Sequence, residues 1–376
     1  MKSPYFHSLA RPSLWVGILS SAVAVLAAVL WPSAFFQSYL VVYLFWLGLT
    51  LGCLVWTLLY PLTGGDWLAG LQKYFSAGRD TLALMIPLFL PLGFGVSFLY
   101  PWADAARVAA DPRLQEKSAY LNLPFFSLRQ VLFFLGWSLI AVGMKRAKSA
   151  HLSRWGAGGL LFYGASMLLA STDWMMSLSP HWSSTIFAFI VMVTQALSAA
   201  AFVIFFQLSV TGKHPPAIPS ADKLGDLGNI LFTLILLWSY LVFMQFLIIW
   251  AGNLPEEVVW YLPRVRGFWG GLIVLLAALQ FAIPFFLLLF RSVKHRAARL
   301  KAIAGGLFAF HFLFMNWLLL PSLPRVSAHD AWIEAILFAA IGGLWLSVFS
   351  RNRRREPPGL AEAAAPPLTS EPMEVS

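Results

Sequence analysis

Cysteine is almost absent from this sequence. Cys53 is the only one among 376 residues, so the chain forms no intrachain disulfide, ligates no iron–sulfur cluster through cysteines and has no C-x-x-C-H haem attachment motif. Histidine is also scarce, and of the seven histidines only His311 lies in the middle of an apolar run. Stacked b-type haems need two axial ligands each, which excludes a dihaem cytochrome b. The sequence therefore predicts no metal-ligand set of its own.

Charged residues are few as well. Only 11% of the residues are charged, whereas 59% are apolar and 17 are tryptophan, a balance with which a water-soluble domain of this size would aggregate. A helix crosses the hydrocarbon core of a bilayer with roughly 20 apolar residues, and the backbone must satisfy its own hydrogen bonds there. The composition therefore predicts an all-α integral membrane protein.

Ten apolar runs are long enough to cross a bilayer. The predicted spans are residues 13–35, 39–60, 81–100, 124–144, 155–174, 184–211, 228–250, 268–290, 302–320 and 331–350. With the N-terminus inside, 19 of the 26 Lys and Arg residues fall on the inner side. By the positive-inside rule, we expect both termini in the cytoplasm and a polytopic membrane domain over residues 1–351.

Three segments interrupt this pattern. Residues 61–79 carry apolar side chains at helical spacing between polar ones, which predicts either a short helix on the cytoplasmic interface or an ordinary connecting loop. Pro87 and Pro91 predict an interruption of the third span. Residues 352–376 are rich in Pro, Ala, Glu and Ser, so we expect a disordered cytoplasmic tail.

Polar side chains at membrane depth are the candidate functional groups, because their burial in hydrocarbon is costly. The candidates for quinone binding or proton transfer are Asp173, His181, His311, Glu334, Gln245 and Asn316. All except His311, which lies nearer the midplane, fall in the outer half of the spans or just beyond it. Quinol oxidation needs a carboxylate or imidazole beside apolar walls, and Asp173 and His181 have that chemistry.

Three of these candidates also have a structural interpretation. Asp173 would cap the end of its helix or pair with a nearby arginine. His181 would be an interfacial residue beside Trp182. His311 would be a packing histidine whose hydrogen bonds are satisfied within the bundle.

Two further carboxylates lie in an outer loop. Glu256 and Glu257 follow Pro255, at a place where carboxylates meet the unpaired N–H groups and the favourable dipole of a starting helix. We expect this pair to begin a helix and to take Arg264 or Arg266 as ionic partners.

Two stretches are specific enough to indicate a family. Residues 171–187 read STDWMMSLSPHWSSTIF, and residues 226–261 read DLGNILFTLILLWSYLVFMQFLIIWAGNLPEEVVWY. Both resemble the signature segments of the quinone-binding membrane subunits of alternative complex III, of the type called ActF, which belong with the polysulfide-reductase (NrfD-like) membrane subunits. The resemblance covers nearly all ten spans. It gives Asp173 and His181, in matching D-W and H-W positions, the quinone-site or proton-exit role.

The resemblance also implies an architecture and a set of partners. It implies two four-helix bundles, formed by the second to fifth and the sixth to ninth spans, with the first and tenth beside them. It implies a complex in the bacterial cytoplasmic membrane that oxidises quinol, commonly menaquinol, and passes electrons to cytochrome c or to an oxidase. The partners are then a sister quinone-binding subunit, an iron–sulfur protein and c-type cytochromes, which hold the iron–sulfur clusters and haem c. The chain alone is expected to be inactive.

Two other functions remain open. A proton-coupled secondary transporter would move two bundles around a midplane site formed by broken helices, whereas here the polar set is displaced outward and only the third span is clearly interrupted by proline. A purely structural subunit would hold the complex together without binding quinone.

Overall fold

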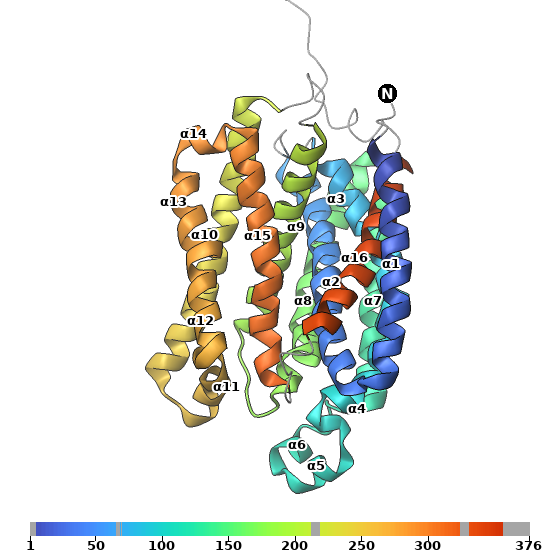
Figure 1. Cartoon of the computed structure of the whole chain (residues 1–376), viewed down its shortest axis with the longest axis vertical. Coiled ribbons are helices and arrows are strands. Elements are labelled where there is room, and N and C mark those ends of the chain that lie inside the picture. The colour runs from blue at the N-terminus through green and yellow to red at the C-terminus, as the bar shows by residue number, and fades with distance from the viewer. Residues whose placement is uncertain (1–4, 65–67, 69, 212–218, 324–330, 356–376) are drawn as a thin grey trace, which may run out of the picture.

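The chain folds into long helices that lie side by side. The computed structural model describes residues 5–64, 68, 70–211, 219–323 and 331–355, and these contain helices but no strands. The axes of the long helices are roughly aligned, and short helices lie at the lower end of the molecule in Figure 1. The predicted all-α membrane architecture is confirmed for this part of the chain. The predicted tail lies outside the described residues from residue 356 onward.

The helices fall into long and short elements. The long ones are α1 (Tyr5–Leu30), α2 (Pro32–Thr63), α4 (Leu82–Leu99), α7 (Leu123–Arg146), α8 (Ser149–Trp174), α9 (Phe187–Thr211), α10 (Ala221–Gly252), α12 (Gly267–Leu276) with η3 (Ala277–Ala282, a π-helix) and α13 (Ile283–Leu289), α15 (Ala297–Leu319) and α16 (Ala331–Arg355). The short ones are α3 (Gln72–Arg79), η1 (Pro101–Ala103), α5 (Ala105–Ala110), α6 (Pro112–Glu116), η2 (Met176–Leu178), α11 (Pro255–Val265), α14 (Arg291–Lys294) and η4 (Leu320–Ser322).

Helix α2 lies at the centre of the assembly. It has 32 residues and no charged side chain, and its most apolar stretch of 18 residues is entirely buried. Helices α1, α3, α4, α8, α9 and α16 pack around it. A helix that is apolar on every side fits such a position, because none of its faces is suited to water.

The remaining long helices form two groups. Helices α4, α7 and α8 pack with α2. Helices α10 and α15 pack with α9, and the α12–α13 segment packs against α10 and α15. Contacts of α9 with α2 and α8 join the two groups. The second group lies to the left in Figure 1, and α1 and α16 lie beside the first group on the right. This arrangement matches the two bundles that the family resemblance implies.

The first helix begins, and the last helix ends, at the same end of the molecule. The Oγ of Ser347 donates to the carbonyl of Ala10 at 2.9 Å, and the rings of Trp31 and Trp332 meet edge to face at the other end, with centroids 5.4 Å apart. Helices α1 and α16 are therefore antiparallel neighbours. It follows that the chain between them crosses the assembly an even number of times.

The number of spans depends on α8. Within the described residues, nine helices are long and apolar enough to cross a membrane, and the predicted span 155–174 is not among them. Helix α8 has the length, with 26 residues, but Gly156, Gly158, Gly159 and Gly164 lower its hydropathy. By length and composition, the number of candidate spans within the described residues is therefore nine and not the predicted ten. An even number of crossings between α1 and α16 requires that α8 also crosses, which gives ten.

The segment predicted on the cytoplasmic interface lies inside the assembly. Tyr74 and Phe75 of α3 are buried, and α3 packs against α2, α9 and α16. A Cβ atom on Gly78 would clash with the Sγ of Cys53 in α2, so the two helices touch directly. The predicted short helix is confirmed in place of a loop, and its apolar side chains face other helices.

The prolines of the third span do not break it. Pro87 and Pro91 lie within the continuous helix α4. The hydroxyls of Tyr39 and Tyr43 in α2 donate to two α4 carbonyls on either side of Pro87, at 2.7 and 2.8 Å. The interruption occurs instead at η3, a π-helix that contains Gln280.

Cysteine labelling tests whether α8 crosses the membrane. Cys53 is buried, so the wild-type chain should not react with a membrane-impermeant maleimide. We expect Lys148→Cys, before α8, to be labelled only after permeabilisation, and Ser183→Cys, after α8, to be labelled in intact cells; both positions are exposed. Arg107→Cys in α5 is the control for the outer side. Labelling of Lys148→Cys and Ser183→Cys from one side would contradict ten crossings.

Candidate functional site

Asp173 forms a buried ion pair with an arginine. Asp173, near the end of α8, is completely buried, and Arg129 in α7 is 3% exposed. The Nε and Nη2 of Arg129 donate to the two carboxylate oxygens of Asp173, each at 2.8 Å, and the Nε2 of Gln130 donates to one of them at 3.0 Å. Removing charges from solvent is costly, and this bidentate geometry compensates each charge with the other.

Aromatic side chains enclose this ion pair. The guanidinium carbon lies 3.9 Å from the ring centroid of Tyr120 and 4.4 Å from that of Phe125. The Nε1 of Trp174 donates to the Oε1 of Gln130 at 2.7 Å. Asp173 therefore has the arginine partner of the structural interpretation, and its side chain lines neither of the two pockets described below.

His181 lies apart from Asp173 and has its own partner. Its Nε2 is 2.7 Å from the Oδ2 of Asp111, and its side chain is 52% exposed. Asp111 also accepts a hydrogen bond from the backbone N–H of Arg113 at 3.0 Å. Desolvation raises the pKa of Asp111, but the hydrogen bonds from His181 and Arg113 outweigh it and hold the pKa below its usual value. The two residues singled out by the resemblance thus belong to separate interactions.

Asn316 and Glu334 are the two candidates that the structure brings together. The side chain of Asn316 on α15 lies beside that of Glu334 on α16, and its Nδ2 donates to the carbonyl of Phe312 at 3.0 Å. His311, also on α15, is 2% exposed, and its ring centroid lies 5.4 Å from that of Phe45. Its Nδ1 has no hydrogen-bond partner within the described residues. His311 is therefore packed as the structural interpretation expects, but that ring nitrogen is left unpaired.

Gln245 lines a cavity that we call the polar pocket. Its volume is about 560 Å³, and it is lined by Leu168, Thr172, Met176, Ser183, Ser184, Thr185, Ile186, Ala188, Gln245, Ile248, Ile249 and Glu257. The Oγ of Ser184 donates to the Oε1 of Gln245 at 3.3 Å. The pocket combines one carboxylate, one amide and four hydroxyls with aliphatic walls. Pockets of this composition orient a polar group within an apolar enclosure.

A turn in the chain brings Glu257 to this pocket. Helix α10 ends at Asn253, which has a left-handed backbone (φ 46°) and whose N–H bonds to the carbonyl of Ile249. Asparagine adopts this conformation more readily than most residues. The chain then reverses into α11, which begins at Pro255 with Glu256 and Glu257 in its first turn. The predicted helix start is confirmed, and Glu257 also faces the pocket that Gln245 lines.

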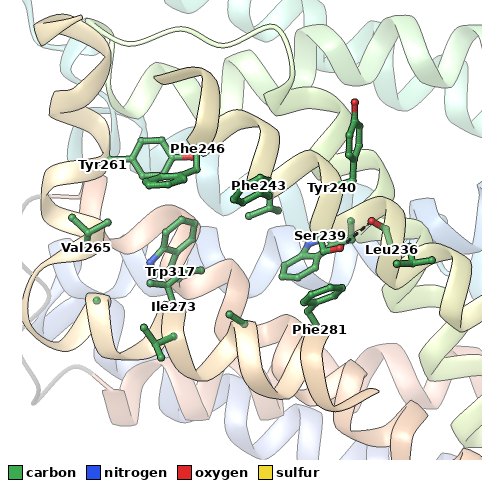
Figure 2. A pocket seen from close by; sticks show the side chains of 15 residues that line it. Leu236, Ser239, Tyr240, Phe243, Phe246, Tyr261, Val265, Ile273, Phe281 and Trp317 are labelled. Carbon is green, nitrogen blue, oxygen red and sulfur yellow. Dashed lines mark hydrogen bonds between the residues drawn. The ribbon is translucent and has the colours of Figure 1, made fainter. Parts of the chain in front are cut away.

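Figure 2 shows a second cavity, which we call the aromatic pocket. Its volume is about 740 Å³, and it is lined by Leu236, Trp238, Ser239, Tyr240, Val242, Phe243, Phe246, Tyr261, Val265, Gly270, Ile273, Val274, Ala277, Phe281 and Trp317. The rings of Phe246 and Tyr261 lie together at one end and Phe281 lies toward the other. No lining residue is charged, which suits an apolar chain or ring. Tyr261 also lies beside Gln245 of the polar pocket, so the two pockets are neighbours.

Arg264 anchors α11 against the second bundle. It is 1% exposed, and its Nη1 and Nη2 donate to the carbonyls of Trp260 and Leu318 at 2.6 and 2.8 Å. Its guanidinium lies 3.6 Å from the Trp260 ring, which stacks on Trp182 at 4.3 Å. Burial lowers the pKa of Arg264 to about 9, which leaves it protonated at neutral pH. The predicted carboxylate partner is wrong, because carbonyls and an aromatic face hold the charge instead.

Two residues of the candidate site are not among those predicted from the sequence. Glu257 was interpreted only as a helix-start residue, although it also lines the polar pocket. Arg129 was overlooked within the fourth predicted span, although the rule that selected Asp173, an ionisable residue at membrane depth, applies equally to it. Gln130, the next residue, completes the same interaction.

Comparison with known proteins adds no identification. No family model matches the chain, and no curated protein matches it in sequence. Within the described residues, no group of three or more His, Cys, Asp or Glu side chains is arranged to hold a metal ion. The family resemblance therefore stays a prediction.

Stability measurements test the importance of the buried ion pair. We expect Arg129→Met to destabilise the protein by about 3–5 kcal/mol, because it leaves Asp173 charged and buried without a partner. The double variant Arg129→Met/Asp173→Asn should lose less stability than Arg129→Met, because it leaves no buried charge without a partner. The control is Arg107→Met, whose pair with Asp104 is 61% and 42% exposed and contributes about 1 kcal/mol or less. Unfolding in detergent micelles would measure all three, and equal losses for Arg129→Met and Arg107→Met would contradict this assignment.

Proposed function

We propose that this chain is the membrane subunit of a respiratory complex that oxidises quinol and passes electrons to cytochrome c or to an oxidase. In this proposal the polar pocket takes the quinone ring. The observation that supports it most is the convergence of Glu257 and Gln245 on one cavity with aliphatic walls. The family resemblance of residues 171–187 and 226–261 supports the same function independently.

The side chains of the polar pocket suit the removal of protons from a quinol. Each quinol loses two protons and two electrons when it is oxidised. The amide of Gln245, which accepts a hydrogen bond from Ser184, orients a ring oxygen, and the carboxylate of Glu257 accepts a hydroxyl proton. Glu257 is partly exposed. It lies in α11, at the end of the molecule opposite the one where α1 begins (Figure 1). Glu257 releases the first proton on the predicted outer side and then accepts and releases the second, and the two electrons pass to cofactors of partner subunits.

The neighbouring elements have supporting roles in this proposal. The aromatic pocket has no charged lining residue and holds the apolar tail, with Tyr261 between tail and ring. The Arg129–Asp173 pair acts as a positioning element, because it fixes the end of α8, where the adjacent Thr172 lines the polar pocket. The Asn316–Glu334 pair and His311 lie on α15 and α16, outside both pockets, and belong to a separate proton path.

One observation favours the secondary transporter as a second candidate. The segment α12–α13 is interrupted at η3, where both amide atoms of the fully buried Gln280 have no hydrogen-bond partner within the described residues. π-helical segments occur often at functional sites, and interrupted helices form transporter binding sites. Substrate or proton uptake by proteoliposomes that contain only this chain would favour the transporter.

Two adjacent carboxylates provide a matched test of the proposed function. We expect Glu257→Gln to lower quinol oxidation by the intact complex by about 100-fold, because a general base typically contributes at least this much. Glu256→Gln, one residue earlier and outside the pocket lining, should keep the wild-type rate. Steady-state quinol oxidation with purified complex measures both, and equal rates for Glu257→Gln and wild type would contradict the assignment of the base.

The binding role of Gln245 is tested separately. We expect Gln245→Leu to raise the KM for quinol by about fivefold, the effect of losing one neutral hydrogen bond of about 1 kcal/mol, while assembly of the complex is unchanged. Ser209→Ala, on α9 outside both pockets, is the control because the Oγ of Ser209 donates to the carbonyl of Phe205 in its own helix. Purification of the chain from its native membrane without any redox partner would contradict the proposed function as a whole.

A further inference from the structure

A groove runs between α7 and α8, at the end of the molecule opposite both pockets. Its volume is about 500 Å³. Gly158 and Gly159 form its floor, and the rings of Trp155 and Phe162, seven residues apart on α8, stand on either side of that floor. Seven residues are two helical turns, so the space between the rings lies along the helix axis. The groove therefore has the elongated form of a hydrocarbon chain.

Glycines of the facing helix hold the two rings in place. A Cβ atom on Gly136 of α7 would clash with the ring of Phe162, and one on Gly143 would clash with the ring of Trp155. Both rings thus lie directly against the backbone of α7. By contrast, a Cβ atom on Gly158 would meet no atom within 4 Å, so the space above the floor is open and not filled by the protein.

The groove opens beside a group of cations. Arg154 and His151, in the first turns of α8, line its mouth and are exposed, and neither side chain has an ion pair within the described residues. Arg146, the last residue of α7, and Lys148, in the turn before α8, are also exposed. Lys145, near the end of α7, is already paired with Asp80 at 3.2 Å. The mouth therefore carries unpaired positive charge.

The position of this mouth places it at the membrane surface. The Oγ of Ser153 bonds to the carbonyl of Pro61 near the end of α2 at 3.0 Å, so the mouth shares the end of the molecule where α1 begins. Trp155, 40% exposed, is of the type that gathers at the boundary of head groups and hydrocarbon. Cations thus lie at the head-group level and the apolar groove extends inward from it.

We propose that the groove binds an anionic phospholipid. The phosphate lies at Arg154 and His151, and one acyl chain lies on Gly158 and Gly159 between the two rings. Charge complementarity selects this occupant, because basic residues beside a hydrophobic groove at the membrane surface attract anionic head groups, whereas a groove without such cations would take any lipid. The inference is independent of the quinol function.

Two variants separate the head-group contact from the chain contact. The full-length chain in its native assembly is exchanged into nanodiscs of phosphatidylglycerol and phosphatidylcholine, extracted in mild detergent, and analysed for retained lipid by mass spectrometry. We expect wild type to retain phosphatidylglycerol over phosphatidylcholine. Arg154→Gln should reduce retained phosphatidylglycerol about fivefold, the effect of one basic residue at a membrane surface. Gly158→Leu should reduce it similarly without any change of charge.

Each variant has a matched control. Arg11→Gln removes an exposed cation from α1 at the same end of the molecule, and Gly164→Leu fills space on α8 outside the groove, where a Cβ atom also meets nothing within 4 Å. Both controls should retain lipid as wild type does. Wild type that retains neither lipid, as it would if a partner helix fills the groove, overturns the proposal. The proposal is also overturned if Arg154→Gln and Arg11→Gln lose equal amounts of retained phosphatidylglycerol, or if Gly158→Leu and Gly164→Leu do.

Discussion

The complete burial of the apolar stretch of α2 determines how the other helices are arranged. In a membrane, helices gain little from hiding apolar surface from one another, so close packing and hydrogen bonds must hold them. Gly52 allows α9 to approach until a Cβ atom would clash with the carbonyl of Gln195. The few polar atoms of α2 bind its neighbours: Thr50 accepts from the Nε1 of Trp345 on α16 at 2.9 Å, and Trp56 donates to the carbonyl of Ala196 on α9 at 2.9 Å.

Tight packing at this centre leaves the cavities to the periphery. The apolar stretches of α10 and the α12–α13 segment are only 22% and 28% buried, against 100% for α2. The aromatic pocket lies among these loosely covered helices, and the polar pocket lies where α10 and α11 meet the end of α8. Two of these elements are anchored by a buried arginine: α8 by Arg129 and α11 by Arg264. A ligand therefore finds open space beside rigid supports.

The spans could be predicted from the sequence because the length of an apolar run is a local property. The partners could not, since they are set by distant segments: Asp173 meets Arg129 44 residues away, and Glu257 reaches the pocket of Gln245 only through the reversal at Asn253. The burial of α3 was missed for the same reason, because an apolar stripe looks alike whether it faces lipid or another helix. Arg129 is different, because a charged residue within an apolar run can be recognised as a candidate from the sequence alone.

Helix α8 shows why composition alone undercounts the crossings. A Cβ atom on Gly156 would lie 2.7 Å from the carbonyl of Leu58, and one on Gly159 would lie 2.6 Å from the side chain of Leu58, so both residues must be small for α8 to pack against α2. Gly158 is free of this constraint and leaves the groove open. Two of the four glycines that make α8 less apolar, Gly156 and Gly159, are thus the residues that fit it against α2, so close packing and low hydropathy have a common cause there.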